Sequence, residues 1–398
     1  PRRTPPTAPR PPSSLEEVFR RWGLDPTLRH YHGRSLGIES LYPWQARCLA
    51  EPGVADGRRN LLYFAPTSGG KTMVAELLLL LRVMGLPAPA RAGRGKEARG
   101  GAGVAKQTGE SLSAREVNRS STCESVKRAV FVLPFISMVT EKVKHLQRVV
   151  APYNRGRPKR QRIKARDASA LYGAKGGGGV RGAQIAVCTI EKANSLVNRM
   201  AAADELDELS CLVLDELHMI GEGGRGQTLE LLLTKMVGSE VAEAGGSAAD
   251  PGETGGRLRT QVIGMSATLS NGAELAAWLD AILHVSEYRP VPLDERVLLG
   301  MHVYDKAGGI VRKFSGPAHP ETDPDHVVTL CRESCRAQDQ VIIFCSTKQF
   351  CHNCAIKVAN NLNVPASKAV ASKRSALMAQ LAKEMSMGVD PILQARFR

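Results

Sequence analysis

The sequence has no long apolar run. A bilayer-spanning helix needs about 18 or more consecutive apolar residues, and the densest apolar stretch, Leu77 to Leu81, is interrupted by Arg82. The sequence also lacks a recognisable signal peptide, and it begins with Pro1 rather than with methionine. We therefore expect neither a secreted protein nor a membrane partner, and we expect the chain to be part of a longer one.

The sequence has fewer acidic residues than basic ones. Lys and Arg number 54 against 39 Asp and Glu, which gives a formal net charge of +15. Such an excess favours a polyanionic partner, because basic side chains release counterions from phosphates. A generic basic surface has the same composition, so charge alone leaves both interpretations open. The nine cysteines, an odd number, indicate reduced thiols in a cytosolic or nuclear compartment.

Stretches of biased composition divide the chain. The first 14 residues hold six prolines and three arginines, a composition that cannot bury a core. We expect residues 1–34 to form a disordered, basic N-terminus. Two stretches rich in Gly and Ala, near 87–123 and 243–256, are predicted to be surface insertions between regular elements.

The remaining sequence alternates strand-like and helix-like segments. Strands are expected at 60–64, 129–133, 184–188, 211–214 and 261–264, each ending in a polar turn before a helix. This order predicts an α/β fold, with a parallel sheet covered by helices on both faces. Sites in such sheets lie at the carboxyl ends of the strands. Beyond Arg289, one strand at 340–344 between two helices predicts a second domain that is incomplete.

A phosphate-binding loop follows the first predicted strand. The residues Ala65-Pro66-Thr67-Ser68-Gly69-Gly70-Lys71-Thr72 match the pattern GxxxxGK[ST], except that Ala65 replaces its first glycine. The glycines let several backbone N–H groups turn toward a phosphate. Lys71 is predicted to contact the β- and γ-phosphates and the Thr72 hydroxyl to ligate Mg²⁺. The loop therefore predicts ATP and Mg²⁺ as cofactors.

Polar residues end two further predicted strands. Asp215 and Glu216 follow the strand at 211–214. Downstream of a phosphate-binding loop, an Asp at this place holds Mg²⁺, and the adjacent Glu is predicted to act as general base for the attacking water. Ser266 and Thr268 end the strand that begins at Gln261. Their hydroxyls are predicted to join the nucleotide site and to link it to the second domain.

Together these segments resemble the Ski2-like branch of the superfamily 2 helicases, over about 41–394. Within that branch the likeness is to the group of DNA repair helicases that holds the POLQ-like helicase HELQ and the helicase part of DNA polymerase theta. The amino-acid sequence of residues 68–72 and 219–223 favours the HELQ type. The segments that carry the resemblance are 41–45, 66–72, 133–135, 188–192, 215–223, 264–269 and 289–292.

The resemblance implies tandem RecA-like domains, the first at 35–288 and a partial second at 289–398. It implies that Gln45 binds the adenine through its amide. Pro134, Ser137 and Thr189 match motifs that contact the sugar-phosphate backbone of the tracking strand. Ser346 and Lys348 match a phosphate-contacting motif of the second domain, although a plain helix cap has the same residues.

The family's later second-domain motifs, with their arginine finger, are not found before Arg398. We therefore expect full activity to need a further C-terminal part. The resemblance implies a nuclear, ATP-driven DNA helicase or translocase of the repair type that moves 3′ to 5′ on single-stranded or forked DNA. An RNA helicase of the same branch remains open, as does a truncated chain that only binds ATP and single strands. The acid-free basic stretch 155–166 fits a phosphate contact, a solvated loop or a nuclear-import signal.

Overall fold

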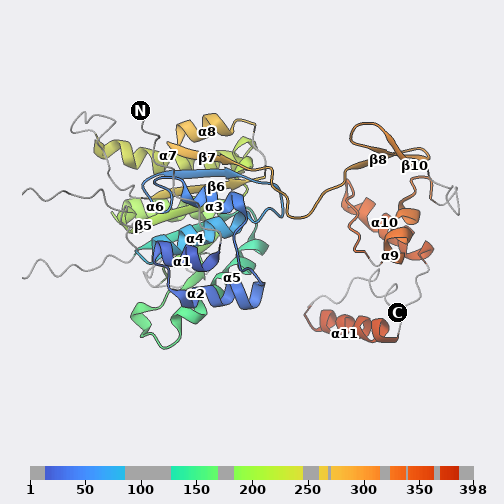
Figure 1. The fold of residues 1–398 in the computed structure, drawn as a ribbon, viewed down its shortest axis with the longest axis horizontal. Coiled ribbons are helices and arrows are strands. Elements are labelled where there is room, and N and C mark those ends of the chain that lie inside the picture. The colour runs from blue at the N-terminus through green and yellow to red at the C-terminus, as the bar shows by residue number, and fades with distance from the viewer. Residues whose placement is uncertain are drawn as a thin grey trace, which may run out of the picture. The chain divides into compact units, whose positions relative to one another are not determined.

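The computed structural model describes residues 14–85, 127–168, 183–244, 260–267, 270–313, 323–337, 339–362 and 368–384. The expected insertion near 87–123 and most of the one near 243–256 lie outside these ranges. The chain divides into two compact units, residues 1–292 and 293–398, and each is described separately below (Figure 1). No helix among the described residues is long and apolar enough to cross a membrane.

The first unit is built on a parallel sheet of seven strands, in the order β3-β4-β2-β5-β6-β1-β7. Every neighbouring pair runs parallel, as the alternation of segments predicted. All five strands expected in this unit form, within two residues of the expected bounds. The strands are β1 Asn60–Phe64, β2 Arg128–Leu133, β3 Ala165–Asp167, β4 Ile185–Thr189, β5 Leu209–Leu214, β6 Gln261–Ser266 and β7 Ala281–Val285.

Helices cover both faces of this sheet, and each face has its own apolar core. Side chains alternate between the faces along each strand: Phe131 of β2 joins one core and Val130 the other. The first core is closed by α1 Leu15–Trp22, α2 Pro26–His30, α3 Pro43–Ala50, α4 Lys71–Val83 and α5 Ile136–Asn154. The second is closed by α6 Ile190–Ala202, α7 Arg225–Ala244 and α8 Gly272–Trp278.

The prediction that residues 1–34 are disordered is wrong for residues 14–34, which form α1, α2 and most of the π-helix η1 (Tyr31–Ser35). Ser14 caps α1, accepting a hydrogen bond from the Glu17 N–H at 3.1 Å, and Gly23 ends the helix at φ 70°. Leu15, Val18, Phe19 and Trp22 are buried in the first core. These four apolar residues share one helical face, so burial stabilises a segment whose proline-rich beginning suggested otherwise. Residues 1–13 lie outside the described ranges.

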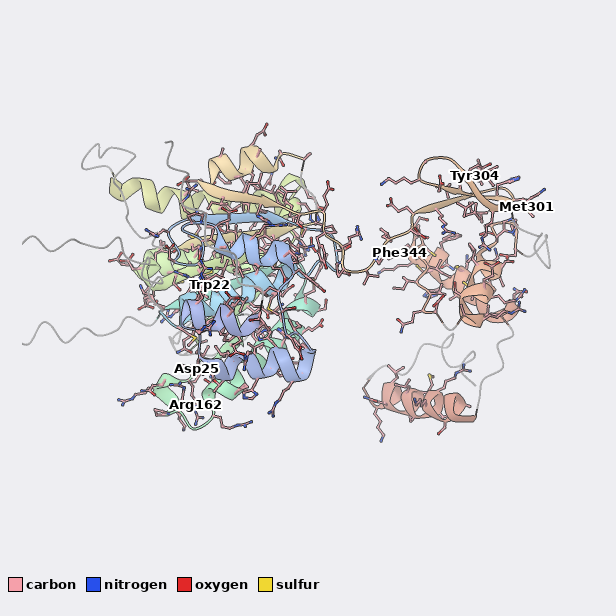
Figure 2. All side chains as sticks on the ribbon, in the orientation of Figure 1. Trp22, Asp25, Arg162, Met301, Tyr304 and Phe344 are labelled. Atoms are coloured by element: carbon pink, nitrogen blue, oxygen red, sulfur yellow. The ribbon has the colours of Figure 1, made fainter. Side chains whose placement is uncertain are left out.

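The second unit differs from the expectation. The segment 340–344 forms no strand, and Ile342 and Phe344 are 78% and 92% exposed. Figure 2 labels Phe344. An apolar segment becomes a sheet strand only beside partner strands, and the described part of the unit places none beside it. Its sheet is instead antiparallel, formed by β8 Arg296–Leu299, β9 His302–Asp305 and β10 Ile310–Lys313. The helices are α9 Val327–Arg336, α10 Lys348–Asn361 and α11 Lys368–Glu384.

Candidate nucleotide and nucleic-acid site

The phosphate-binding loop connects β1 to α4 at the carboxyl edge of the sheet. Gly70 caps α4 in the left-handed region at φ 81°, and Ser68 also has a positive φ, 63°. A Cβ on Gly69 would lie 2.8 Å from the Pro66 carbonyl oxygen, so only glycine fits this close turn. Thr67 and Ser68 are exposed at the tip of the loop. The loop thus presents backbone N–H groups at the N-terminus of a 13-residue helix, an arrangement that suits anions.

Lys71 occupies the first turn of α4. Its Nζ donates hydrogen bonds to the carbonyl oxygens of Ala65 and Pro66, at 2.9 and 3.3 Å. Burial lowers the pKa of the Lys71 ammonium, while the charges of Glu216 and Asp215 oppose that shift. The ammonium therefore lies inside the loop, between the loop backbone and the two acids.

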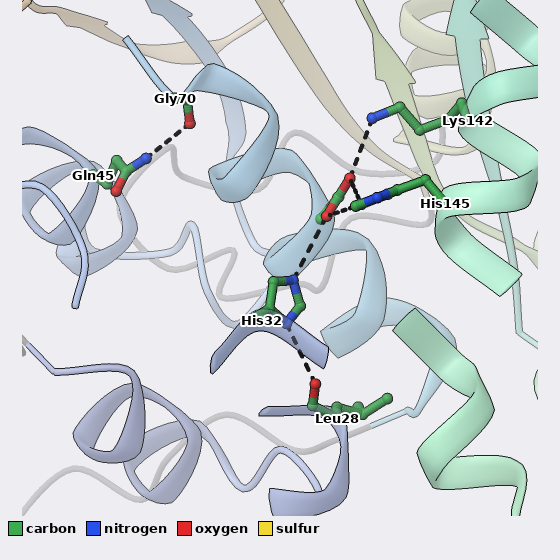
Figure 3. Close-up of polar contacts among 7 residues, drawn as sticks. Leu28, His32, Gln45, Gly70, Lys142 and His145 are labelled. Atoms are coloured by element: carbon green, nitrogen blue, oxygen red, sulfur yellow. Dashed lines mark hydrogen bonds and ion pairs between the residues drawn. The ribbon is translucent and has the colours of Figure 1, made fainter. Parts of the chain in front are cut away.

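Helix α3 holds the loop from the outside, an arrangement that we did not predict. The Trp44 indole N–H donates to the Gly69 carbonyl oxygen at 3.1 Å. The Gln45 amide N–H donates to the Gly70 carbonyl oxygen at 2.8 Å (Figure 3), and its Oε1 accepts from the Tyr42 N–H at 2.8 Å. Both ends of the Gln45 amide are thus engaged within the chain, which leaves one amide N–H and one oxygen lone pair for a ligand. The adenine role of Gln45 stays a prediction.

Asp215 and Glu216 follow the end of β5. Burial raises the pKa of the Asp215 carboxyl, and the charge of Glu216 raises it further. The Glu216 N–H, which donates to Asp215 Oδ1 at 2.9 Å, and the charges of Lys142 and Lys71 act in the opposite direction. Glu216 itself is left-handed at φ 52°, a conformation that costs a non-glycine residue about 1–3 kcal/mol. Residues with such strained backbones cluster at active sites and switch regions.

His218 links these acids to the end of β6. It lies on the 3-10 helix η6 (Leu217–Gly221), with its Nδ1 3.3 Å from Glu216 Oε2 and 3.2 Å from the Ser266 hydroxyl. Ser266 is fully buried, and its carbonyl oxygen accepts from the Ala65 N–H at 3.2 Å. The structure therefore joins Ser266 to Glu216 through His218, a residue of the segment 215–223 to which the sequence analysis assigned no role. Thr268 lies outside the described residues.

A cavity of about 870 Å³ is lined by some of the predicted nucleotide residues, but its lining does not include Thr67, Gly69, Lys71, Glu216 or Ser266. Its lining includes Gln45, Ser68, Gly70, Thr72 and Asp215. The Thr72 hydroxyl and the Asp215 carboxylate are oxygen donors of the kind that Mg²⁺ prefers. A nucleoside triphosphate with Mg²⁺ fits the chemistry of this cavity.

The predicted strand-contacting residues lie along the same edge of the sheet. Ser137 is exposed in the first turn of α5, whereas Thr189, at the start of α6, is only 7% exposed. Arg225, which no motif indicated, contacts both the residues after β2 and the first turn of α6. It donates to the Pro134 carbonyl oxygen at 3.2 Å, pairs with the Glu191 carboxylate at 3.0 Å and lies over the Phe135 ring. Arg225 thus links the residues after β2 to the first turn of α6.

In the second unit, Ser346 and Lys348 are exposed at the N-terminus of α10. Thr347 caps this helix, accepting from the Phe350 N–H at 3.1 Å. The helix-cap interpretation therefore accounts for the local geometry without a ligand, and phosphate binding by these two residues stays a prediction.

The basic stretch 155–166 lies at the opposite end of α5. That helix has 19 residues and spans about 28 Å at 1.5 Å per residue. Arg155, Arg162, Lys164 and Arg166 line an open hollow of about 690 Å³ that has no acid in its lining. The Asn154 side chain shapes it by bonding to both the N–H and the carbonyl of Ile163, at 2.8 and 2.7 Å. Figure 2 labels Arg162 on this loop.

The chain is similar in sequence to known proteins. Residues 42–276 match the sequence model of the DEAD/DEAH box helicase family. DNA polymerase theta of Mus musculus is 36% identical over 345 residues, which cover 86% of the chain and 11% of that protein. Human Helicase POLQ-like is 29% identical over 372 residues, which cover 88% of the chain and 27% of that protein. The chain thus spans only a small part of the length of either relative.

The sequence of the motifs favoured the HELQ type, but the overall identity is higher to the mouse polymerase theta.

The crystal structure of the DUF1998 helicase MrfA bound to DNA aligns with a TM-score of 0.51 at 14% identity, over 90% of the chain and 43% of that structure. At this identity the likeness shows the fold alone, and it agrees with the predicted fold class.

Proposed function

The chain belongs to the DEAD/DEAH box helicase family, and on that premise we propose that it is the motor part of an ATP-dependent DNA helicase or translocase. We propose 3′ to 5′ movement on single-stranded or forked DNA, in DNA repair and in the nucleus. Residues 289–398 are proposed to begin the second RecA-like domain. The observation that carries the proposal is the single cavity that brings Thr72 and Gly70 of the phosphate-binding loop together with Asp215.

The ATP half of the proposal assigns a task to each group at the sheet edge. Backbone N–H groups of the loop and Lys71 would hold the phosphates, and Lys71 would exchange its bonds to Ala65 and Pro66 for phosphate oxygens. Mg²⁺, when bound by Thr72 and Asp215, neutralises charge that develops on the phosphates. Glu216, whose carboxylate lies 3.3 Å from His218 Nδ1, would accept the proton of the attacking water.

The DNA half rests on the loops beside that cavity. Pro134, Ser137 and Thr189 are proposed to contact the sugar-phosphate backbone, which positions a strand without reading its sequence. Arg225 supports this role because it contacts both Pro134 and Glu191, which lies two residues after Thr189. DNA rather than RNA is proposed because the mouse relative is a DNA polymerase by name.

A strand-displacement assay tests the proposal. The protein that contains this chain and its later second-domain motifs is given DNA and RNA duplexes with a 3′ or a 5′ single-stranded tail, with Lys71→Ala as the inactive control. We expect ATP-dependent displacement of 3′-tailed DNA. Displacement confined to RNA would identify an RNA helicase instead, and nucleotide-dependent single-strand binding without hydrolysis or displacement would leave only a binding module.

A further inference from the structure

A buried carboxylate lies one helical turn beyond the predicted metal ligand. Glu76 follows Thr72 by four residues on α4, so the two side chains lie on the same face of the helix. Glu76 is 2% exposed and lines the same cavity as Thr72 and Asp215. No step of the proposed reaction uses it.

Three basic side chains surround this carboxylate (Figure 3). From α5, Lys142 Nζ lies 3.2 Å from Glu76 Oε1, and His145 Nε2 lies 2.8 and 3.0 Å from the two carboxylate oxygens. From η1, His32 Nε2 lies 3.7 Å from Oε2, while its Nδ1 contacts the Leu28 carbonyl oxygen at 3.3 Å. Glu76 therefore joins the phosphate-loop helix to α5 and to the N-terminal helical segment.

Burial alone would raise the pKa of the Glu76 carboxyl. The hydrogen bonds from His145, the nearby His32 ring and the charge of Lys142 outweigh burial and hold that pKa well below its usual range. The carboxylate is thus charged in the interior of the unit. Buried ion pairs contribute little net stability compared with apolar residues of similar volume, so stability is a weak explanation for this cluster. What such a cluster does impose is one relative position of the helices that it joins.

The helices joined here serve the two halves of the proposed function. Helix α4 begins at Lys71 and Thr72, and α5 begins beside Pro134 and carries Ser137 in its first turn. Lys142 is five residues after Ser137 and also lies over the ring of Phe131, 4.9 Å from its centroid. A bound DNA strand that shifts the start of α5 would therefore move Lys142 and His145 relative to Glu76.

We propose that Glu76, through Lys142 and His145, is the positioning residue that transmits strand binding at the start of α5 to the phosphate-binding loop. The proposal rests on the proposed function and adds to it the path by which DNA and nucleotide affect each other. Such coupling is reciprocal, so that each ligand changes the affinity of the other by the same factor, typically about 5- to 150-fold.

The test is this factor, measured by binding alone. The dissociation constant of single-stranded DNA is determined with and without a non-hydrolysable ATP analogue and Mg²⁺. The proteins are the wild-type chain, Glu76→Gln, Lys142→Gln and Lys142→Arg, each checked for folding by its melting temperature. Glu205→Gln is the matched control, because it removes one carboxylate that pairs with a mostly buried arginine, Arg128, at the start of β2.

We expect a wild-type factor in the range of about 5- to 150-fold. It should fall to within about twofold of unity in Glu76→Gln and Lys142→Gln, and be largely retained in Lys142→Arg and Glu205→Gln. Lys142→Gln keeps the test decisive if Glu76→Gln does not fold. A wild-type factor of one, an unchanged factor in Lys142→Gln, or an equal loss in Glu205→Gln would overturn the coupling role. Each of these results leaves the strand-displacement test of the proposed function unaffected.

Discussion

The Gln45 side chain donates a hydrogen bond to the carbonyl oxygen of Gly70, 2.8 Å away (Figure 3). The same two residues also approach so closely that a Cβ on Gly70 would lie 2.6 Å from Gln45 Nε2. Gly70 moreover has φ 81°. The left-handed φ and the close approach of helix α3 therefore both favour glycine at this position.

We predict that Gly70→Ala weakens binding of ATP and Mg²⁺ at least about tenfold, which corresponds to about 1.4 kcal/mol. Gly85→Ala is the matched control, because Gly85 ends the same helix at φ 63° but has open space around its Cβ position. Both substitutions carry backbone strain, so both should lower the melting temperature. Equal nucleotide affinity in the two variants would show that the contact with Gln45 does not shape the loop.

The central part of the fold could be predicted because its signals are local. An apolar run that ends in Gly69-Gly70-Lys71-Thr72, or in Asp215-Glu216, fixes a strand end and a helix start together. The residues that link these motifs were missed for a physical reason. His218 and Arg225 act through contacts with residues far away in the sequence, Ser266 and Pro134, and no spacing rule reveals such contacts.

The two errors had different causes. The amphipathic pattern of α1 between Leu15 and Trp22 was available, but the proline-rich residues before it governed the interpretation. At 340–344 the apolar pattern was interpreted from the segment alone. Whether such a segment becomes a strand depends on its neighbours, and the described residues place no strand beside it.

The basic hollow at the end of α5 yields a second prediction. If Arg162 and Arg166 contact DNA phosphates, neutralising both to Gln should make the slope of log K against log salt shallower by about 1.4, at about 0.7 per contact with a single strand. Lys159→Gln with Arg160→Gln is the control, because these two residues lie in the same loop but do not line the hollow. Unchanged slopes in both variants would show that the hollow does not contact DNA, and the loop would then be a solvated loop or a nuclear-import signal.

Acid stability should depend on Glu76. The pKa of its carboxyl in the folded protein lies well below the ordinary value of 4.5. Its contribution to stability is therefore fully present above about pH 4.5 and is lost as the pH falls through the folded-state pKa. We predict that the wild-type free energy of unfolding falls more steeply below pH 4.5 than that of Glu76→Gln, as measured by urea unfolding across pH. Parallel curves for the two proteins would contradict the buried charged state.

Because Asp215 and Glu216 are assigned different roles, we predict that substituting them has different effects on nucleotide binding and hydrolysis. Asp215→Ala removes a proposed metal ligand, so it should weaken binding of ATP with Mg²⁺ as well as hydrolysis. Glu216→Gln keeps the shape and removes the base, so nucleotide should still bind. Equilibrium binding of ATP with and without Mg²⁺ separates the two, and a Glu216→Gln variant that fails to bind nucleotide would contradict the division of roles.

Single-turnover ATP hydrolysis on single-stranded DNA is the most direct test, with Glu216→Gln beside wild type in the protein that carries both domains. A positioned general base contributes about 10² or more to the rate. We predict a loss of at least that size with ATP still bound, and a longer dwell time on DNA. Hydrolysis by Glu216→Gln at the wild-type rate would contradict the account, because Asp215 and Glu216 would then not be the catalytic pair.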